Sequence, residues 1–225
     1  MNILVVQLYT NHIKDIALLS SSNIQKYCSK YDYDYKCYTD TLDSTRHPAW
    51  SKIRTIQESL GGEYDWVWWI DADAFVANDE YVLKDIITEY SKNDVDIIFT
   101  DQKYRHNVNS GSMLVRNSEF SKQFFDDVYS NTKINPTKKE CCWEQDSINK
   151  LLFDSTDVRK PSEYTINEQY ADKIVIVDNH IFNSVYNPHT TCEHLQTYKD
   201  GDFVIHFAGP VDIKQIQTKL KDIGL

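Results

Sequence analysis

The chain lacks the features that mark several large classes of protein. None of its apolar runs reaches the roughly 18 residues that a membrane span needs. The apolar run at residues 2–9 is short and has no preceding charged segment, so it is more typical of a strand than of a signal peptide. No asparagine lies in an N-x-S/T acceptor except Asn135, whose N-P-T sequence is blocked by proline. We therefore expect a soluble, cytoplasmic protein.

Cysteines and basic charge are also informative through what they do not provide. The five cysteines are odd in number, follow no regular spacing and form no C-x-x-C zinc pattern. Cys141 and Cys142 are adjacent, but we favour reduced thiols over a redox pair. A net charge of -10 argues against nucleic acid as the main partner. An enzyme of this charge needs a local cation or a metal to bind phosphate groups.

The chain does contain a regular alternation of strand and helix patterns over its first hundred residues. Its 225 residues and 41% hydrophobic content are enough for one domain with a substantial core. The expected strands are 2–9, 33–39, 66–70, 96–100, 111–117, 173–177 and 202–207. The expected helices are 12–30, 47–62, 79–91, 118–130, 143–153 and 213–223, with a polar loop at 131–142. This order predicts an α/β fold with a Rossmann-like, doubly wound, mostly parallel twisted sheet flanked by helices.

The apolar strand WVWWI at 66–70 runs directly into Asp71, Ala72 and Asp73. Sheets of this kind bind their ligands at the carboxyl ends of the strands. In extended chain, the i, i+2 spacing puts both carboxylates on one face, and Ala72 leaves room beside them. Two hard oxygen ligands suit Mg²⁺ or Mn²⁺, whose open positions a diphosphate can fill. The alternative is that one aspartate caps the next segment and the other is simply exposed.

A second enzyme class uses the same triplet. Phosphatases of the haloacid dehalogenase type have a hydrophobic strand followed by D-x-D-x-[TV], with the first aspartate as nucleophile. Here Phe75 occupies the fifth position, and the triplet lies a third of the way along the chain rather than at the first strand. Both differences weaken this interpretation.

Further stretches of the sequence suggest a family. They are HPAWSK at 47–52, NSGSMLVRNS at 109–118, WEQDSINKLL at 143–152 and VIHFAGP at 204–210. With WVWWIDADAFV, they resemble the galactosyl-, xylosyl- and mannosyltransferase family that includes plant xyloglucan xylosyltransferases (glycosyltransferase family 34). The resemblance covers roughly residues 47 to 209, and a more distant similarity extends to glycogenin-like transferases. It implies a GT-A fold, a nucleotide-sugar donor with UDP-sugars favoured, a Mn²⁺ ion (or Mg²⁺) and retention of anomeric configuration.

The resemblance also implies roles for particular residues. The metal ligands would be Asp71, Asp73 and His206. The catalytic candidates beneath the anomeric carbon of the donor are Gln145, Glu144 and Asp146. The donor-binding candidates are Gln7, Lys52, Asp71, Ala72, Asp73, Asn109, Gly111, Ser112 and Gly209. The alternatives are a purely structural His206, helix capping by the acids next to Gln145, a simple turn at Gly111 and a solvated Lys52.

A retaining glycosyltransferase of this family moves a hexose or pentose to a glycan or other hydroxyl acceptor. The resemblance implies a nucleotide-binding half at about 1–105, an acceptor and catalytic half at about 106–210 and a C-terminal helix at 211–223. Two routes to retention stay open. Gln145 or a neighbouring carboxylate forms a transient covalent adduct, or the acceptor attacks from the side that the diphosphate leaves. The weak nucleophilicity of an amide favours the second route.

The sequence departs from the family at one point. The relatives have a lysine soon after H-F-x-G that helps to hold the diphosphate, whereas Pro210 and Val211 follow Gly209 here and the first lysine is Lys214. Leaving-group stabilisation would then depend more on the metal or on Lys52. The alternative function is therefore a catalytically impaired nucleotide-sugar- or glycan-binding protein. The relatives also carry an N-terminal membrane anchor and a stem. This sequence shows neither pattern, so we expect a minimal, soluble catalytic domain here.

Overall fold

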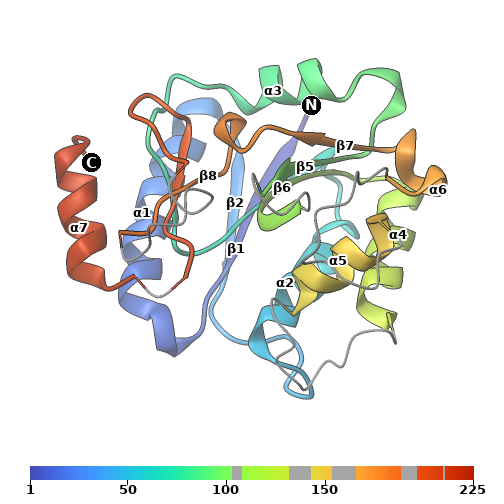
Figure 1. Cartoon of the computed structure of the whole chain (residues 1–225), viewed down its shortest axis with the longest axis horizontal. Helices are drawn as coiled ribbons and strands as arrows, with labels where there is room; N and C mark the ends of the chain where they lie inside the picture. Colours follow the sequence, from blue (N-terminus) through green and yellow to red (C-terminus); the bar gives the residue numbers. More distant parts are fainter. Residues whose placement is uncertain (103–107, 132–142, 154–165, 189–196, 210) are drawn as a thin grey trace.

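The computed structural model describes residues 1–102, 108–131, 143–153, 166–188, 197–209 and 211–225 (Figure 1). Its main sheet has six strands in the order β2-β1-β3-β6-β5-β7. These strands are β1 (Ile3–Leu8), β2 (Asp34–Tyr38), β3 (Trp66–Ile70), β5 (Ile97–Asp101), β6 (Val108–Arg116) and β7 (Ile174–Val177). The α/β prediction with a mostly parallel sheet is confirmed.

Strand β6 is the exception to the parallel arrangement. It pairs antiparallel with both of its neighbours, β3 and β5, whereas the other pairings in this sheet are parallel. The sheet is therefore mostly parallel, as predicted, with β6 as its antiparallel strand. A parallel partner needs a crossover connection of a dozen or more residues, and the sequence between β5 and β6, residues 102–107, is too short for one.

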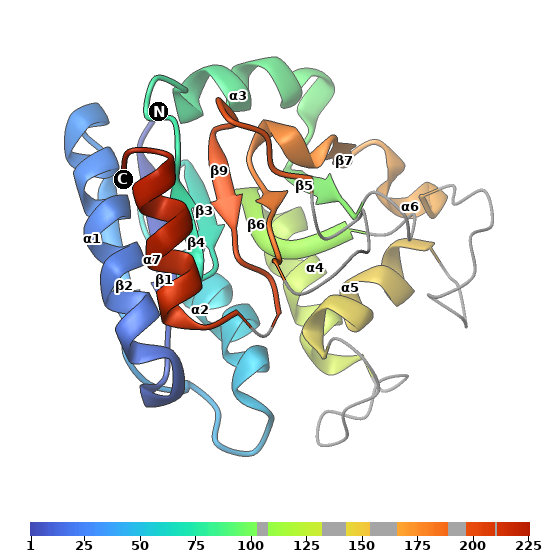
Figure 2. The same cartoon turned by 60° about the vertical axis from the view of Figure 1, so that its left-hand side comes forward.

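Helices cover both faces of the main sheet (Figures 1 and 2). They are α1 (Lys14–Tyr31), α2 (Ser51–Ser59), α3 (Leu83–Tyr90), α4 (Glu119–Ser130) and α5 (Glu144–Phe153). Because successive side chains of a strand point to opposite faces, a strand covered on both sides must be apolar throughout. All five residues of β3 are buried. Val67 and Trp69 pack with residues of α2, α4 and α5, whereas Trp66, Trp68 and Ile70 pack with residues of α1 and α3.

A second, three-stranded sheet has the order β4-β9-β8. Its strands are β4 (Ala74–Val76), β8 (Ser184–Val185) and β9 (Val204–His206). Ala74 pairs with His206 in the antiparallel β4–β9 ladder, so the strand that follows the two aspartates lies directly beside the histidine. Helix α1 also holds the small sheet in place, because Ser20 Oγ donates a hydrogen bond to the backbone oxygen of Ala74 at 2.6 Å. This small sheet is what brings residue 206 to residues 71–73.

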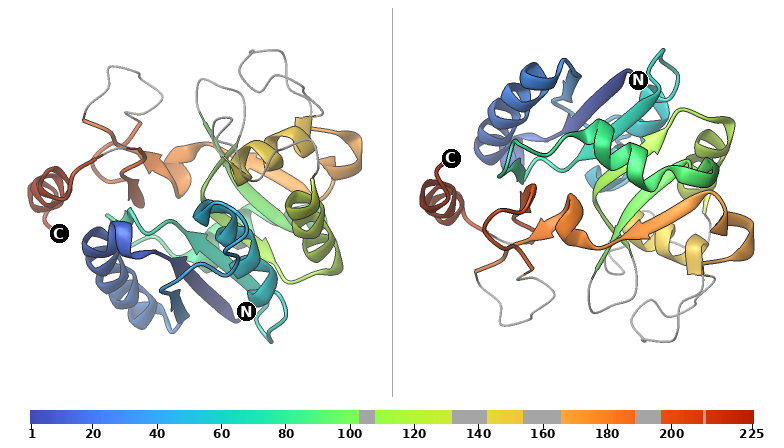
Figure 3. Two further views of the ribbon diagram at one scale, coloured as in Figure 1. Left: turned by 90° about the horizontal axis from the view of Figure 1, so that it is seen from below. Right: turned by 90° about the horizontal axis from the view of Figure 1, so that it is seen from above.

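The C-terminal helix α7 (Ile213–Asp222) covers the small sheet. Its buried Ile216 and Leu220 pack with Phe75 of β4, Ile205 of β9 and Phe207. Asp212 begins the helix with a capping box that also uses Gln215. Figures 2 and 3 show α7 beside α1 at one end of the molecule, with α4 towards the other end.

Most of the other predicted elements agree with the structure. The predicted helix at 79–91 is shorter, and the strand predicted at 111–117 begins earlier and includes residues 108–110. Residues 132–142 of the polar loop expected at 131–142, with its two cysteines, lie outside the described residues, while Cys28 and Cys37 are free thiols. The helices predicted at 12–30 and 47–62 each begin with a 3-10 turn, η1 (Asn11–Ile13) and η2 (Pro48–Trp50). The short elements not predicted include β4, β8, α6 (Glu168–Ala171), η3 (Lys92–Asp94) and η4 (Asn179–Ile181). No helix in the described part of the chain combines the length and apolar composition needed to cross a bilayer.

Candidate functional site

A cavity of about 460 Å³ lies at the carboxyl ends of β1 and β3. Its wall is formed by residues that follow β1, residues of η2 and α2, the segment 71–73, the first part of β6, the start of α5 and the segment 206–209. Its volume is in the range of sites that bind small molecules and cofactors. Residues from almost the whole length of the chain therefore meet in one cavity, at the edge where an α/β sheet binds ligands.

The D-A-D segment is a turn. Ala74 N donates to Asp71 O at 3.1 Å, and Asp71 N donates to the backbone oxygen of Gly111 at 2.7 Å. The expectation that extended chain puts both carboxylates on one face is therefore wrong in detail. The chain reverses here because it leaves the main sheet after β3 and enters the small sheet as β4. The turn itself brings the two carboxylates together.

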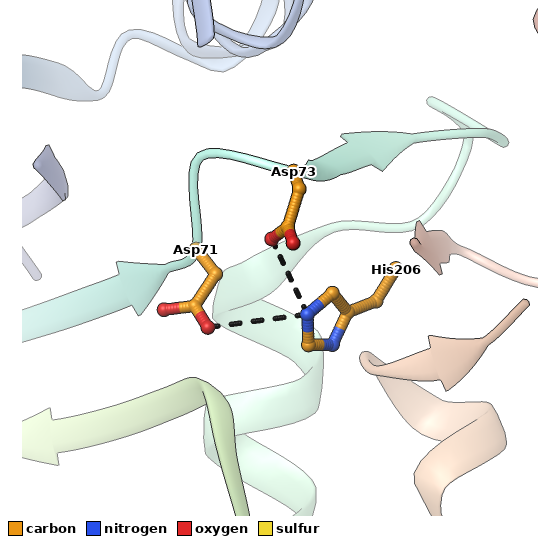
Figure 4. Close-up of side chains that lie close together, drawn as sticks. All are labelled: Asp71, Asp73 and His206. Atoms are coloured by element: carbon orange, nitrogen blue, oxygen red, sulfur yellow. Dashed lines mark ion pairs between the residues drawn. The ribbon is translucent and has the colours of Figure 1, made fainter. Parts of the chain in front are cut away.

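Asp71, Asp73 and His206 form a cluster that can hold a divalent cation (Figure 4). His206 Nε2 lies 3.4 Å from Asp73 Oδ1 and 3.9 Å from Asp71 Oδ2. The ligand atoms of the three residues lie within 4.8 Å of one another. The imidazole is buried and the two carboxylates are partly exposed, so one side of the cluster is open to the cavity. Two oxygen ligands and one nitrogen ligand with open positions suit a catalytic divalent metal.

The electrostatics of His206 agree with this arrangement. Burial disfavours the charged imidazole, but the carboxylates of Asp73 and Asp71 outweigh burial and raise the pKa of His206 above its ordinary value. The same two carboxylates would attract a metal cation. The three side chains thus form a site that favours positive charge.

Gly111 has a steric role next to this cluster. A Cβ atom at this position would lie 2.2 Å from Cε1 and 2.7 Å from Nδ1 of His206. Such distances are far below van der Waals contact, so any larger residue would displace the imidazole. The ring of His206 therefore packs directly on the backbone of β6.

Lys52 of α2 is buried and joins two acidic residues of the site. Its Nζ lies 3.0 Å from Asp71 Oδ1 and 2.9 Å from Glu144 Oε1, and it donates to Ser110 O at 3.0 Å. These contacts use all three hydrogens of the ammonium group. Burial lowers the pKa of Lys52, but the carboxylates of Asp71 and Glu144 raise it by more than burial lowers it. The net shift of the pKa is therefore upward, and the residue is charged. Lys52 thus balances two carboxylates rather than offering a free donor to the cavity.

Glu144 and Gln145 begin α5 and line the cavity. Gln145 Oε1 accepts a hydrogen bond from Ser110 N at 2.9 Å, and its Nε2 donates to Gln102 at 3.2 Å. Burial raises the pKa of Glu144, although Lys52 opposes this effect. The second carboxylate oxygen of Glu144, Oε2, is buried and has no hydrogen-bond partner among the described residues. The start of α5 therefore presents a fixed amide and an unsatisfied carboxylate oxygen.

A family model described as "Protein of unknown function, DUF273" matches residues 21–153. The chain belongs to this family. The matched range includes the D-A-D turn, Lys52, the first part of β6 and the start of α5. The matched range stops well before His206. It therefore covers much of the cavity wall, but it does not include the histidine of the Asp71, Asp73 and His206 cluster.

Relatives of known type are glycosyltransferases. A galactomannan galactosyltransferase of Cyamopsis tetragonoloba is 28% identical over 124 residues, which are 52% of this chain and 28% of that protein. A probable xyloglucan 6-xylosyltransferase of Arabidopsis thaliana is 29% identical over 125 residues, which are 52% of this chain and 27% of that protein. The aligned part is thus less than a third of the length of each relative. The predicted resemblance to galactosyl- and xylosyltransferases is confirmed.

The fold has counterparts among solved structures. It resembles that of a glycosyltransferase involved in the glycosylation of the major capsid of PBCV-1, with a TM-score of 0.66 at 14% identity. The match covers 99% of this chain and 100% of that chain. At this identity the likeness concerns the fold, and it confirms the GT-A architecture expected from the sequence.

Three of the predicted site residues do not reach the cavity. Gln7 is buried beneath it, where its Nε2 donates to Asp71 O at 3.2 Å. Ser112 is buried and its Oγ accepts from Trp68 Nε1 at 2.8 Å. Asp146 is buried within α5 and does not belong to the cavity wall. These positions do not match direct donor or substrate contacts for the three residues.

The other predicted residues line the cavity, and the structure adds some that were not predicted. Ala72, Asn109 and Gly209 belong to the wall together with the residues described above. Tyr9 and Thr10 line it in place of Gln7, and counting further past the end of the first strand would have pointed to them. Trp143 is a further unpredicted residue of the wall, whereas His47 and Asn183 were also not predicted and contact residues of the wall without belonging to it. The Trp143 ring lines the cavity and stacks on His47 with centroids 3.8 Å apart.

Proposed function

We propose that this chain is a metal-dependent, retaining glycosyltransferase. It would move a hexose or pentose from a nucleotide-sugar, with UDP-sugars favoured, to a glycan or other hydroxyl acceptor. The observation that carries this proposal is the cluster of Asp71, Asp73 and His206 in the wall of a cavity at the strand ends of a GT-A fold. The galactosyl- and xylosyltransferases among the relatives support a donor of the same kind.

The proposed metal site uses this chain's residues in defined ways. Asp71, Asp73 and His206 would hold Mn²⁺, or Mg²⁺ as the second choice, because an imidazole nitrogen is a softer ligand than oxygen. A bound divalent cation supplies Lewis-acid stabilisation of the charge that develops on a departing diphosphate, worth several kcal/mol. Lys52 holds both Asp71 and Glu144 in place and offsets their negative charge, since its ammonium group contacts both carboxylates. Because these contacts occupy Lys52, a direct contact between Lys52 and the diphosphate is not part of the proposal. The metal would then stabilise the leaving group in place of the lysine that the relatives have after H-F-x-G.

The start of α5 would lie beneath the sugar of the donor. Gln145 and Glu144 line the cavity and are the proposed residues near the anomeric carbon, whereas Asp146 is buried and is not part of the cavity wall. Gln145 Oε1 already accepts a hydrogen bond from Ser110 N, which makes it a poorer nucleophile. This supports retention by same-face attack over a covalent adduct on Gln145. Residues 1–105 would then form the nucleotide-binding half and residues 106–210 the acceptor and catalytic half, with the helix at 211–223 covering the small sheet.

The test is metal-dependent cleavage of a nucleotide-sugar. Wild-type protein is incubated with Mn²⁺ and UDP-galactose, UDP-xylose or GDP-mannose, and release of the nucleoside diphosphate is measured with and without EDTA. We expect Asp73→Asn to lower the Mn²⁺-dependent rate by about 100-fold or more, the usual scale for losing one electrostatic stabiliser. NMR of the transfer product reads its anomeric configuration directly.

The matched control is Asp79→Asn, which removes a carboxylate that pairs with Lys30 away from the cavity. Its cleavage rate should equal that of the wild type. Circular dichroism of both variants checks that the fold is retained. An Asp73→Asn variant with wild-type activity and an intact fold would refute the metal assignment. Binding of a nucleotide-sugar by the wild type without any cleavage or transfer would favour the non-enzymatic alternative.

A further inference from the structure

Asn183 is a fully buried residue between η4 and β8, away from the stretches that the motifs single out. Its side chain contacts three different strands. Its Nδ2 lies 2.9 Å from Thr100 Oγ1 of β5 and 2.9 Å from Asn109 Oδ1 of β6. Its Oδ1 lies 2.9 Å from Nδ1 of His206 in β9. One amide group thus connects the main sheet to the imidazole of the acidic cluster.

The direction of each hydrogen bond follows from a single fixed donor. The backbone N–H of Gly111 donates to Asn109 at 2.8 Å, so the Asn109 atom at this contact is its oxygen. The Asn183 atom that faces this oxygen must then be the donating Nδ2. The remaining Asn183 atom is its oxygen, which can only accept, and it faces Nδ1 of His206. Nδ1 must therefore carry a hydrogen.

The consequence for His206 concerns its other ring nitrogen. A neutral imidazole carries one hydrogen, and with that hydrogen on Nδ1 the lone pair is on Nε2. Nε2 is the atom that faces the carboxylates of Asp71 and Asp73. The ring has little freedom to turn, because Gly111 packs against its Cε1 edge.

We propose that Asn183 is a positioning residue that fixes the tautomer and orientation of His206 for metal binding. The proposal rests on the proposed function and deepens it. Asn183 does not touch the metal site directly, and it acts through the imidazole. Without it, Nδ1 loses this acceptor, and the neutral ring can place its hydrogen on Nε2, which then cannot act as a ligand.

The first experiment needs no variant. In metal-free wild-type protein labelled with ¹⁵N-histidine, long-range ¹H–¹⁵N NMR spectra distinguish the two neutral tautomers. The His206 signal is assigned by its loss in His206→Asn, and the pH is raised until the nitrogen shifts of this ring are those of the neutral form. We expect the hydrogen on Nδ1. A ring that carries it on Nε2 would overturn the proposal even if every Asn183 variant fails to fold.

The second experiment measures Mn²⁺ affinity, by electron paramagnetic resonance of the free ion, in Asn183→Leu. We expect the Kd to rise by about 10- to 100-fold, the usual effect of removing such a partner from a metal-binding histidine. The NMR spectrum of this variant should show His206 with a share of the Nε2–H tautomer. Leucine has a similar size, so the change removes the polar atoms rather than the volume.

Asn179→Leu is the matched control. Asn179 is equally buried in the same segment, and its side-chain atoms have no hydrogen-bond partner among the described residues. It should leave both the Mn²⁺ affinity and the tautomer of His206 unchanged. An equal loss of affinity in Asn179→Leu and Asn183→Leu, with an unchanged tautomer, would reduce Asn183 to a structural residue and overturn the proposal.

The outcomes also separate this inference from the proposed function. If the wild type binds Mn²⁺ more tightly than Asn183→Leu and shows the Nδ1–H tautomer, the positioning role is supported even when no nucleotide-sugar is cleaved. In that case the proposed enzyme activity alone fails. Absence of Mn²⁺ binding by the wild type would overturn both.

Discussion

Among single residues, Gly111 matters because it has no side chain, which leaves room for the ring of His206. We predict that Gly111→Ala weakens Mn²⁺ binding strongly, because the added Cβ would lie 2.2 Å from Cε1 of His206 and must displace the imidazole from its position beside the two aspartates. Titration with Mn²⁺ measures this effect, and thermal unfolding reports the accompanying loss of stability. A Gly111→Ala variant with wild-type Mn²⁺ affinity would show that the ring can bind the ion from another position.

Gly62→Ala is the control for the extra methyl group. A Cβ at Gly62 would meet the backbone oxygen of Ser59 at 3.3 Å, and it lies outside the cavity wall. This variant should bind Mn²⁺ as the wild type does. A shared loss of affinity in both glycine variants would point to a general effect on the fold.

At the same scale, the sequence predicted the chemistry of the site better than its supporting contacts. Asp71 and Asp73 were recognisable because two carboxylates directly after an apolar strand are unusual, and His206 was recognisable through the resemblance of its H-F-x-G stretch to the transferase family. Asn183 had no such signal. Its importance depends on contacts with Thr100 and Asn109, which are far away in sequence, and an asparagine after Phe182 looks like an ordinary loop residue.

Among the elements, the segment between β2 and η2 is held against α4 by a polar cluster. Tyr129 of α4 donates a hydrogen bond to Asp43, and the Arg46 guanidinium lies 3.8 Å from the centre of the Tyr129 ring. Hydrogen bonds from Thr45 and Tyr129 lower the pKa of Asp43 to about 2, from 3.8 in the unfolded chain. Because the folded pKa is the lower one, the stabilisation is complete above about pH 4 and is lost as the pH falls towards 2.

We therefore predict that Tyr129→Phe destabilises the protein at pH 6 and that its difference from the wild type shrinks as the pH falls from 4 towards 2. Urea unfolding of both proteins across this range measures the difference. Tyr81→Phe, which changes an exposed tyrosine elsewhere, should show no such pH dependence. A difference that stays constant with pH would mean that Tyr129 stabilises the fold by packing alone.

The elements themselves were predictable where their patterns were long. The apolar periodicity of α1, α2 and α7 and the continuous apolar runs of β1 and β3 gave the correct element types. The direction of β6 and the existence of β4 and β8 were not apparent. Strands of two or three residues carry almost no periodic pattern, and the direction of a strand depends on its connection and not on its own residues.

For the whole molecule, the site is linked to global stability because so many elements contribute to it. We predict one cooperative unfolding transition, as expected for a single domain, and an increase in Tm with Mn²⁺ and UDP together. A ligand at about 100 times its Kd adds roughly 2.7 kcal/mol, which for a domain of this size corresponds to a shift of about 5–10 °C. EDTA should reverse the shift.

His206→Asn is the control for this linkage, and its Tm should not respond to Mn²⁺. Two separate transitions would contradict the expected single domain. An unchanged Tm of the wild type at saturating Mn²⁺ and UDP would contradict the proposed donor site. The expected cytoplasmic location stays a prediction, as do the identities of the donor and the acceptor.

The joint between the two sheets has a consequence for synthesis and for fragments. Both aspartates emerge from the ribosome early, but the imidazole belongs to a strand that is made near the end and must insert beside β4. A nascent chain, or a fragment limited to residues 21–153, would carry the acids without their partner. Such a fragment should show little affinity for manganese. The region that the family model matches is therefore smaller than the unit needed to bind the metal.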